Sequence, residues 1–229
     1  MRQPLPPKNA KDTQETEKAP FLVVKKIREG ILDGIFKPGD HLGEIELAEK
    51  FEVSRSPVRE ALVSLEKQGT IIISPYKGAI VRPLSASEVL DIAELRLALI
   101  SLALKPAYRH LSPADLDHAY DLAKRLTRVN SAKVFFDYNW QFWASILSKA
   151  QRPILSEVFQ ELEDRMARYY PLLLKLFPLA RPGEILIEKY RKGKIAEAFR
   201  AFKKIYLEIV AGVVDHLENK KAGNSSARS

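Results

Sequence analysis

One stretch of this chain constrains its fold more than any other: LAEKFEVSRSPVREAL, residues 47–62. Apolar residues at positions 47, 48, 51 and 53 form a first stripe. Val58, Leu62 and Leu65 form a second, at the i, i+4, i+7 spacing of a packed helix. The break between the stripes predicts two helices joined by a tight turn.

The second of these helices carries polar groups at its start. Ser54 occupies the expected N-cap position, and Pro57 falls in the first turn, where its missing N–H costs little. Arg55 and Arg59 are four residues apart, so they share a face away from the apolar stripe. Helix N–H groups, a hydroxyl and two guanidinium groups suit a phosphate backbone and a guanine edge. The alternative is a helical hairpin with ordinary surface arginines.

A β-hairpin is expected directly after these helices. Two β-branched segments, Thr70–Ser74 and Ala79–Arg82, flank the turn Pro75-Tyr76-Lys77-Gly78. An amphipathic helix over residues 20–33 precedes the two helices, so three helices and a hairpin predict a winged helix-turn-helix. The tip residues Tyr76, Lys77 and Gly78 can enter a minor groove, and a plain hairpin turn is an equally good interpretation.

The rest of the chain, from about residue 86, is expected to be helical. Proline, glycine and Asn-Ser breakers separate segments near 86–109, 113–130, 132–148, 152–174, 182–190 and 194–217. The fold class is therefore mainly α, with an N-terminal winged helix-turn-helix, a small β-hairpin wing and a C-terminal all-α antiparallel bundle. The predicted divisions are a disordered arm over 1–19, a DNA-binding domain over 20–84, a helical domain over 85–219 and a flexible tail over 220–229.

Composition excludes several classes of protein. The absence of cysteine rules out disulfides and thiolate metal sites. No apolar run approaches the ~20 residues of a membrane span, and the N-terminal segment lacks the apolar core of a signal peptide. We therefore expect a cytoplasmic protein that does not associate with membranes.

The net charge of +8 favours an anionic partner. Residues 1–83 contain 14 Lys and Arg against 12 Asp and Glu, whereas residues 84–229 contain 23 against 17. Bulk charge therefore does not single out the N-terminal part, and the DNA interpretation depends on local placement of cations.

No pattern of catalytic residues is present. Acidic pairs such as Glu161 with Asp164 lie at helical spacing and indicate solvated faces. The sequence has no phosphate-binding loop, no H-E-x-x-H and no G-x-S-x-G. We expect no catalytic residues and no enzymatic activity.

The segment IFKPGDHLGEIELAEKFEVSRSPVREALVSLEKQGTIIISPYKGAIV resembles the DNA-binding domain of GntR-superfamily transcription regulators. It shares the PG turn, the LA…V-S-R-x-P-V-R-E-A-L core and the wing glycine. The resemblance implies a homodimer that binds a short palindromic operator in double-stranded DNA. It assigns DNA contacts to Ser54, Arg55, Ser56, Arg59, Lys77 and Gly78.

The helical remainder resembles the FCD effector domain of the FadR branch. The shared features are Arg96, Asp137 with Trp140, Pro153-Ile154-Leu155, and Gly193 followed by Ala198. The resemblance implies that residues 85–219 bind an effector and dimerise.

Most members of this class hold a metal ion with one aspartate and three histidines. The resemblance implies that Asp137 occupies the aspartate position of this metal site. Gln141, four residues further on, stands where the family has its first metal-binding histidine. The other two positions fall near Gly183 and near Ile205 or Tyr206, and the chain's histidines, His41, His110, His118 and His216, coincide with none of them. A carboxylate and an amide suit zinc or nickel poorly, so we expect no metal and no other cofactor.

An effector cavity is expected inside the bundle, on the helices that carry Arg96, Asp137 and Gln141. Arg96 either reaches out to water or clamps an oxyanion through its guanidinium. Apolar area would come from the aromatic side chains of the next helix, Tyr138, Trp140, Phe142 and Trp143, although such a stripe more often forms core. The predicted effector-binding residues are Arg96, Asp137, Trp140 and Gln141, and the predicted ligand is a small organic acid or an acyl thioester.

Two functions remain open at this point. The first is a ligand-responsive DNA-binding regulator, expected to repress transcription. The second is a constitutive DNA-binding regulator whose helical domain only dimerises and binds no effector.

Overall fold

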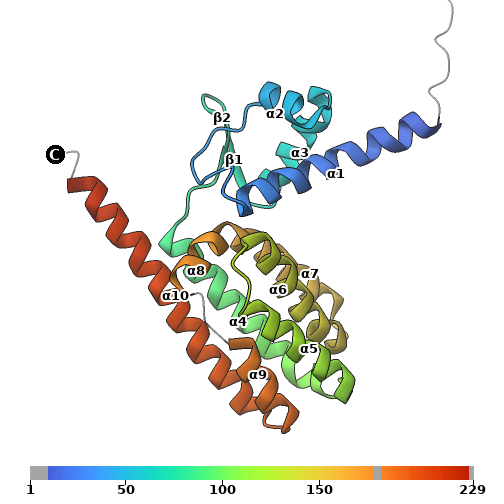
Figure 1. Cartoon of the computed structure of the whole chain (residues 1–229), viewed down its shortest axis with the longest axis vertical. Coiled ribbons are helices and arrows are strands. Elements are labelled where there is room, and N and C mark those ends of the chain that lie inside the picture. Colours follow the sequence, from blue (N-terminus) through green and yellow to red (C-terminus); the bar gives the residue numbers. More distant parts are fainter. Residues whose placement is uncertain (1–9, 178–181, 227–229) are drawn as a thin grey trace, which may run out of the picture. The chain divides into compact units, whose positions relative to one another are not determined.

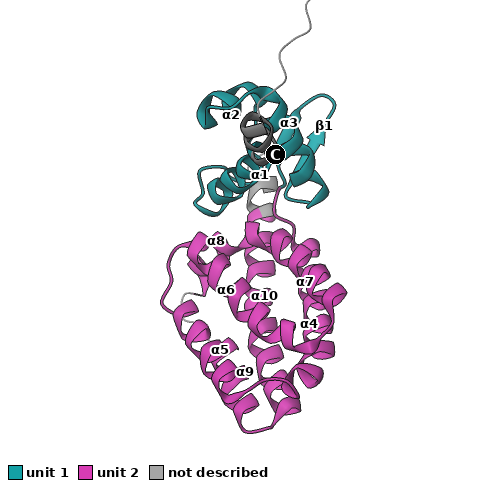
Figure 2. Cartoon of the chain, turned by 90° about the vertical axis from the view of Figure 1, so that its right-hand side faces the viewer, with its two compact units in different colours: residues 1–82 teal, residues 83–229 magenta. Residues whose placement is uncertain are grey.

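The computed structural model of the chain describes residues 10–177 and 182–226. The chain divides into two compact units, of which the first ends at Arg82 and the second begins at Pro83 (Figure 2). This boundary lies two residues before the predicted one. Its position matches the end of the hairpin, beyond which Pro83 cannot donate a ladder hydrogen bond.

The first unit is a winged helix-turn-helix, as predicted (Figure 1). Its elements are α1 Ala10–Leu32, α2 Glu44–Phe51, α3 Arg55–Lys67, β1 Ile71–Ser74 and β2 Gly78–Val81. The two strands pair antiparallel, with Ile71 opposite Val81 and Ser74 opposite Gly78. This register places Ile71, Ala79 and Val81 in the core of the unit.

The first helix begins earlier than predicted. It starts at Ala10, inside the segment 1–19 that was expected to be a disordered arm. Residues 10–19 are rich in alanine, lysine, glutamate and glutamine, which have high helix propensity, so they continue the amphipathic helix. Residues 1–9 lie outside the described residues.

The predicted apolar stripes form the core of this unit. Val58, Leu62 and Leu65 of α3 are buried, together with Ile27 of α1, against which α3 packs. The helix α2 is followed by its C-cap residue Glu52, whose backbone adopts the left-handed conformation with φ of 57°. The N–H of Glu52 bonds back to the carbonyl groups of Ala48 and Glu49. This reversal makes the tight turn that separates the two stripes.

The second unit is an antiparallel helical bundle without strands among its described residues. Its helices are α4 Ala86–Tyr108, α5 Pro113–Leu126, α6 Ala132–Leu147, α7 Pro153–Met166, α8 Tyr170–Leu176, α9 Pro182–Arg191 and α10 Ile195–Ser226, with 3₁₀ turns η1 Ser148–Ala150 and η2 Ala167–Tyr169. The helix α4 packs against both α10 and α7. The helix α10 continues into the segment 220–229 that was predicted to be a flexible tail.

The prediction of a single helix over residues 152–174 is wrong, because this segment forms the three elements α7, η2 and α8. Pro171 lies in the first turn of α8. Within a continuous helix its ring would clash with a carbonyl group one turn earlier and one backbone hydrogen bond would be lost. The break buries Arg168, Tyr169 and Tyr170 in the interior of the unit.

Among the described residues, no helix combines the length and the apolar character that crossing a lipid bilayer requires.

The core position Leu65 provides a test of the fold of the first unit. Leu65 is 0% exposed, so Leu65→Ala should lower the free energy of unfolding by about 2–5 kcal/mol through lost burial and a residual cavity. Differential scanning calorimetry measures this loss. Val63→Ala, on the exposed face of the same helix, should change stability by less than about 0.5 kcal/mol. Equal effects of the two substitutions would contradict the assigned helix face.

Candidate functional site

The start of α3 presents its polar groups to solvent. Ser54 has the extended backbone of an N-cap, with φ of −71° and ψ of 168°, yet its hydroxyl makes no capping hydrogen bond. Ser56 donates its hydroxyl to Glu60 Oε1 at 3.1 Å. Ser54, Ser56 and Arg55 are all exposed. The hydroxyl of Ser54 and the guanidinium of Arg55 are therefore open to an external acceptor.

Arg59 forms a bidentate ion pair on this surface. Its Nε and Nη2 donate to Glu44 Oε1 and Oε2 at 3.2 and 3.0 Å, from α3 to the first turn of α2. The hydrogen bond from Arg59 lowers the pKa of Glu44, and the same contact raises the pKa of Arg59. The side chain of Arg59 nevertheless stays 70% exposed, so the pair orients the guanidinium without burying it.

The tip of the hairpin is the most exposed part of the wing. Tyr76 is 97% exposed, and Lys77 and Gly78 are exposed beside it. Gly78 has φ of +65°, and a Cβ at this position would lie 3.0 Å from Nε2 of His41. Both the backbone conformation and the close approach of His41 therefore require glycine here. Gly78 shapes the turn, whereas Tyr76 and Lys77 are the side chains that project from it.

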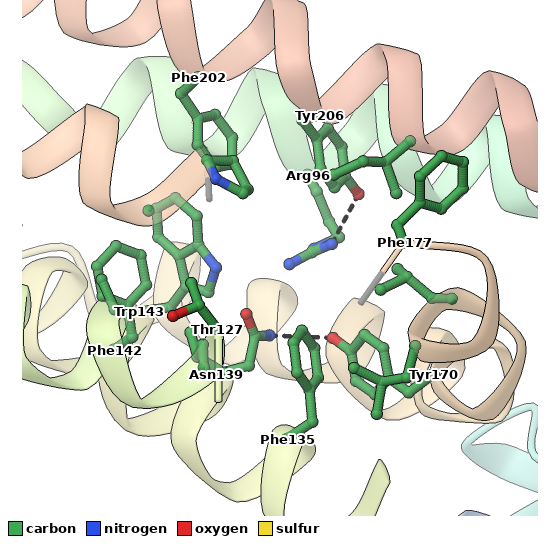
Figure 3. A pocket seen from close by; sticks show the side chains of 17 residues that line it. Arg96, Thr127, Phe135, Asn139, Phe142, Trp143, Tyr170, Phe177, Phe202 and Tyr206 are labelled. Carbon is green, nitrogen blue, oxygen red and sulfur yellow. Dashed lines mark hydrogen bonds between the residues drawn. The ribbon is translucent and has the colours of Figure 1, made fainter. Parts of the chain in front are cut away.

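A cavity of about 70 Å³ lies inside the second unit (Figure 3). Residues from α4, α5, α6, α8, α9 and α10 contribute to its wall. The wall is mainly aromatic and aliphatic, and its polar side chains are Arg96, Thr127, Asn139, Tyr170 and Tyr206. A few polar groups set among apolar ones is a composition typical of small-molecule sites.

A buried ion pair lies against this cavity. Arg96 of α4 and Glu163 of α7 are 3% and 1% exposed, and Nη2 of the arginine contacts Oε1 of the glutamate. Nη1 of Arg96 donates to the hydroxyl of Tyr206 at 2.6 Å. The guanidinium also lies over the rings of Phe159 and Tyr206, at 5.3 and 5.2 Å from the ring centres.

The carboxylate of Glu163 has two further partners. Asn139 of α6 donates through Nδ2 and Tyr170 of α8 donates through its hydroxyl, each to Oε2 at 2.5 Å. The same Nδ2 of Asn139 donates to the Tyr170 hydroxyl at 3.0 Å. The network thus joins side chains from α4, α6, α7, α8 and α10 around one carboxylate.

The electrostatics of the pair follow from its burial. Burial is the largest single influence on Arg96 and disfavours its charge, but Glu163, Tyr206 and Tyr170 together outweigh burial and raise the pKa of the arginine. Burial raises the pKa of Glu163, against the opposing effects of Arg96, Tyr170 and Asn139. Because a guanidinium does not lose its proton in proteins, Glu163 is held as its counter-ion.

Three of the four predicted effector residues do not line the cavity. Asp137 and Gln141 are exposed, and Trp140 is only half-buried and does not line the wall. The cavity face of α6 is formed by Phe135, Asn139, Phe142 and Trp143, which share the i, i+4, i+7, i+8 spacing of one helix face. Residues 137 and 141 are rotated away by two positions, so the expectation that Asp137, Trp140 and Gln141 line the cavity is not met. Asn139 and Trp143 lie on the cavity face of the helix instead.

Arg96 is buried and does not extend to water, which excludes one of its two interpretations. The oxyanion that it clamps is Glu163 of the protein itself, a residue that sequence reasoning missed. A signal for Glu163 existed, because it replaces an apolar residue in the i, i+4, i+7 stripe of Phe159, Glu163 and Met166.

The cavity residues do not fit a metal ion. Gly183 and Tyr206 lie near the two other histidine positions that the family resemblance implies, and both line the cavity without offering an imidazole. The described residues contain no group of three His, Cys, Asp or Glu side chains that could hold a metal.

The size of the cavity also limits the ligand. A volume of 70 Å³ accommodates roughly five water molecules. An acyl thioester is far larger, so the cavity as it stands does not admit the larger of the two predicted ligands.

Comparison with known proteins identifies two domains. The family described as bacterial regulatory proteins, gntR family, matches residues 22–81, and the FCD domain matches residues 91–215. The HTH-type transcriptional regulator McbR of Escherichia coli (strain K12) is 29% identical over 162 residues, which cover 69% of this chain and 72% of that protein.

Two further comparisons extend this result. The uncharacterized HTH-type transcriptional regulator YdhC of Bacillus subtilis (strain 168) is 35% identical over 107 residues, which cover 47% of this chain and 46% of that relative, or about half its length. The solved structure of E. coli McbR/YncC superimposes with a TM-score of 0.73 at 21% identity and covers 87% of this chain and 98% of that one. At this identity the structure shows a shared fold.

The ion pair provides a test of the helical unit. Glu163→Ala leaves the buried guanidinium of Arg96 without a counter-ion and should lower the free energy of unfolding by about 3–5 kcal/mol. Urea denaturation followed by tryptophan fluorescence reports this unit, because both tryptophans, Trp140 and Trp143, belong to it. Replacement of both charges, Arg96→Met with Glu163→Leu, should recover much of the loss. A double variant no more stable than Glu163→Ala would contradict the assignment.

Proposed function

The chain belongs to the GntR family of bacterial regulatory proteins and carries an FCD domain, and on this premise we propose that it binds a short palindromic operator as a homodimer under the control of a small ligand. It is a transcriptional regulator, and the prediction that it is not an enzyme is confirmed by the families that match it and by its named relatives.

The exposed guanidinium groups of α3 carry the proposal for DNA binding. Arg55 and Arg59 lie on one helix face, near backbone N–H groups at a helix start and the hydroxyls of Ser54 and Ser56. A helix presented in this way can enter a major groove with its N-terminal residues at the base edges. The arginines would recognise guanine, and the hydroxyls and N–H groups would hold phosphates.

The ion pair with Glu44 supports this role for Arg59. An exposed ion pair contributes little to stability, so a guanine edge or a phosphate can replace Glu44 at small cost. In the absence of DNA, the pair holds the guanidinium in one orientation at the surface. Less side-chain conformational entropy of Arg59 is then lost when DNA binds. Lys77 and the exposed Tyr76 would add wing contacts to the backbone or minor groove.

The second unit supports the proposed homodimer. Large apolar side chains are exposed on two helices that pack together: Leu95 and Leu102 on α4 are 55% and 53% exposed, and Ile154 on α7 is 74% exposed. Exposed apolar groups of this kind are typical of a protein interface. Two-fold pairing of the chain would then match the two-fold symmetry of a palindromic operator.

Ligand binding in the cavity would act through the bundle. A ligand with different affinities for two arrangements of the helices shifts the population between them, and hence the operator affinity of the dimer. A dimer bound across a promoter would exclude RNA polymerase sterically, so we propose repression as the outcome and the cytoplasm as its location.

One observation favours the second candidate function, a constitutive regulator. The cavity is small, and the Nη groups of Arg96 are already engaged by Glu163 and Tyr206. In that case the cavity would be a packing defect and the helical unit would serve only to dimerise.

The recognition-helix assignment is tested by operator binding. Arg59→Ala and Arg55→Ala should each weaken binding to the selected operator by about 5- to 150-fold, with much less effect on unrelated DNA, because base contacts supply discrimination. Fluorescence anisotropy at fixed salt measures both affinities. The control Lys67→Ala removes an exposed cation from the far end of the same helix and should leave specificity unchanged. Unaltered operator binding by both arginine variants would remove the central assignment.

The proposed dimer is tested by sedimentation equilibrium. The full chain of 26.0 kDa should sediment at twice this mass. Introducing a charge in the exposed apolar face, as in Leu102→Glu, should shift it toward the monomer, because a charge buried in an interface is costly. Asp121→Lys, at an exposed position on α5, is the control. A monomer at operator-binding concentrations would contradict the model of paired half-site recognition.

A further inference from the structure

The charge balance of the cavity constrains the chemistry of its ligand. Among the described residues that line the cavity, Arg96 is the only one with a charged side chain. Its charge is matched by Glu163, which lies behind the wall and contacts the guanidinium directly. The guanidinium and its counter-ion therefore sum to no net charge within the described part of the site.

An anionic ligand would disturb this balance. It would compete with Glu163 for Arg96, and two carboxylates would then share one guanidinium in a buried site. Burial of an unmatched charge carries a large desolvation penalty. Glu163 cannot move aside cheaply either, because Asn139 and Tyr170 hold its Oε2.

Three polar groups of the wall have no hydrogen-bond partner among the described residues. Nδ2 of Asn139 is engaged by Glu163 and Tyr170, but its Oδ1 accepts no hydrogen bond within the described part of the chain. The indole N–H of Trp143 likewise donates to no described residue, and Figure 3 shows it turned toward the middle of the cavity, near Asn139 and Arg96. Nε of Arg96 is also buried without an acceptor among the described residues.

We propose that the cavity binds a small uncharged molecule that carries both a hydrogen-bond acceptor and a donor, of the kind found in a primary amide. The acceptor would take the indole N–H of Trp143, and the donor would reach Oδ1 of Asn139. Aromatic side chains, including Phe135, Phe142 and Phe202, enclose its apolar part. The inference rests on the proposed ligand-responsive function and replaces the predicted organic acid with a neutral ligand.

The experiment compares two probes of nearly equal shape, propionamide and propionate, which have the same number of non-hydrogen atoms and differ in charge at neutral pH. Both are small enough for the cavity and bind weakly, so each is titrated at millimolar concentration into the ¹⁵N-labelled full chain. The readout is the indole N–H resonance of Trp143. The chain has one other tryptophan, Trp140, which does not line the cavity and serves as an internal reference.

Propionamide should shift the Trp143 resonance saturably while the Trp140 resonance stays in place. Propionate should bind at least about tenfold more weakly, because it adds an unmatched charge. The variant Glu163→Gln keeps the shape of the side chain but leaves the charge of Arg96 unmatched, so it should reverse the preference in favour of propionate. Glu161→Gln, an exposed position on the same helix, should leave the preference unchanged.

Three outcomes would overturn the inference: propionate binding at least as tightly as propionamide in the unmodified chain, no shift of Trp143 with either probe, or a folded Glu163→Gln variant that still prefers the amide. If that variant does not fold, the comparison in the unmodified chain decides alone. Operator affinity, measured on the same preparation without probe, separates a failure of this inference from a failure of DNA binding.

Discussion

A guanidinium in the interior of a helical bundle must be matched by a carboxylate, and much of the second unit is organised by that requirement. Arg96 and Glu163 join α4 to α7, and Tyr206, Asn139 and Tyr170 attach α10, α6 and α8 to the same pair. Burial of the network costs desolvation free energy, and its ion pair and hydrogen bonds offset this cost only while every member is present. It therefore fixes the relative positions of five helices more strictly than apolar packing alone would.

The same pairing of arginine with glutamate serves an opposite purpose in the first unit. Arg59 and Glu44 meet at the surface, where water screens the interaction and the arginine stays open to a stronger partner. Burial makes the Arg96 pair a fixed part of the architecture, whereas exposure makes the Arg59 pair exchangeable. The difference follows from dielectric environment, since the residue types are identical.

The polar groups of the cavity wall differ from the metal ligands that the family resemblance implies. The wall contains Gly183 and Tyr206, near the positions where the family resemblance implies metal-binding histidines, and its α6 face carries an amide and an indole. With Arg96 matched by an internal counter-ion and no metal-binding group among the described residues, the proposed ligand would be selected by hydrogen bonding and shape. Such selection suits a neutral ligand, because buried polar groups left unpaired are costly.

The sequence by itself determined the two-part organisation, the helix-turn-helix with its hairpin, and the exposure of Arg55 and Arg59. These depend on local periodicity and on turn chemistry, which a short window contains. It did not determine which face of α6 meets the cavity, because the choice between Asp137 with Gln141 and Asn139 with Trp143 is a rotation of one helix against its neighbours. Nor did it reveal that Arg96 is paired with Glu163, 67 positions along the chain. Only tertiary structure decided these points, since the packing of α4 against α7 brings the two charges together and their burial makes the pairing obligatory.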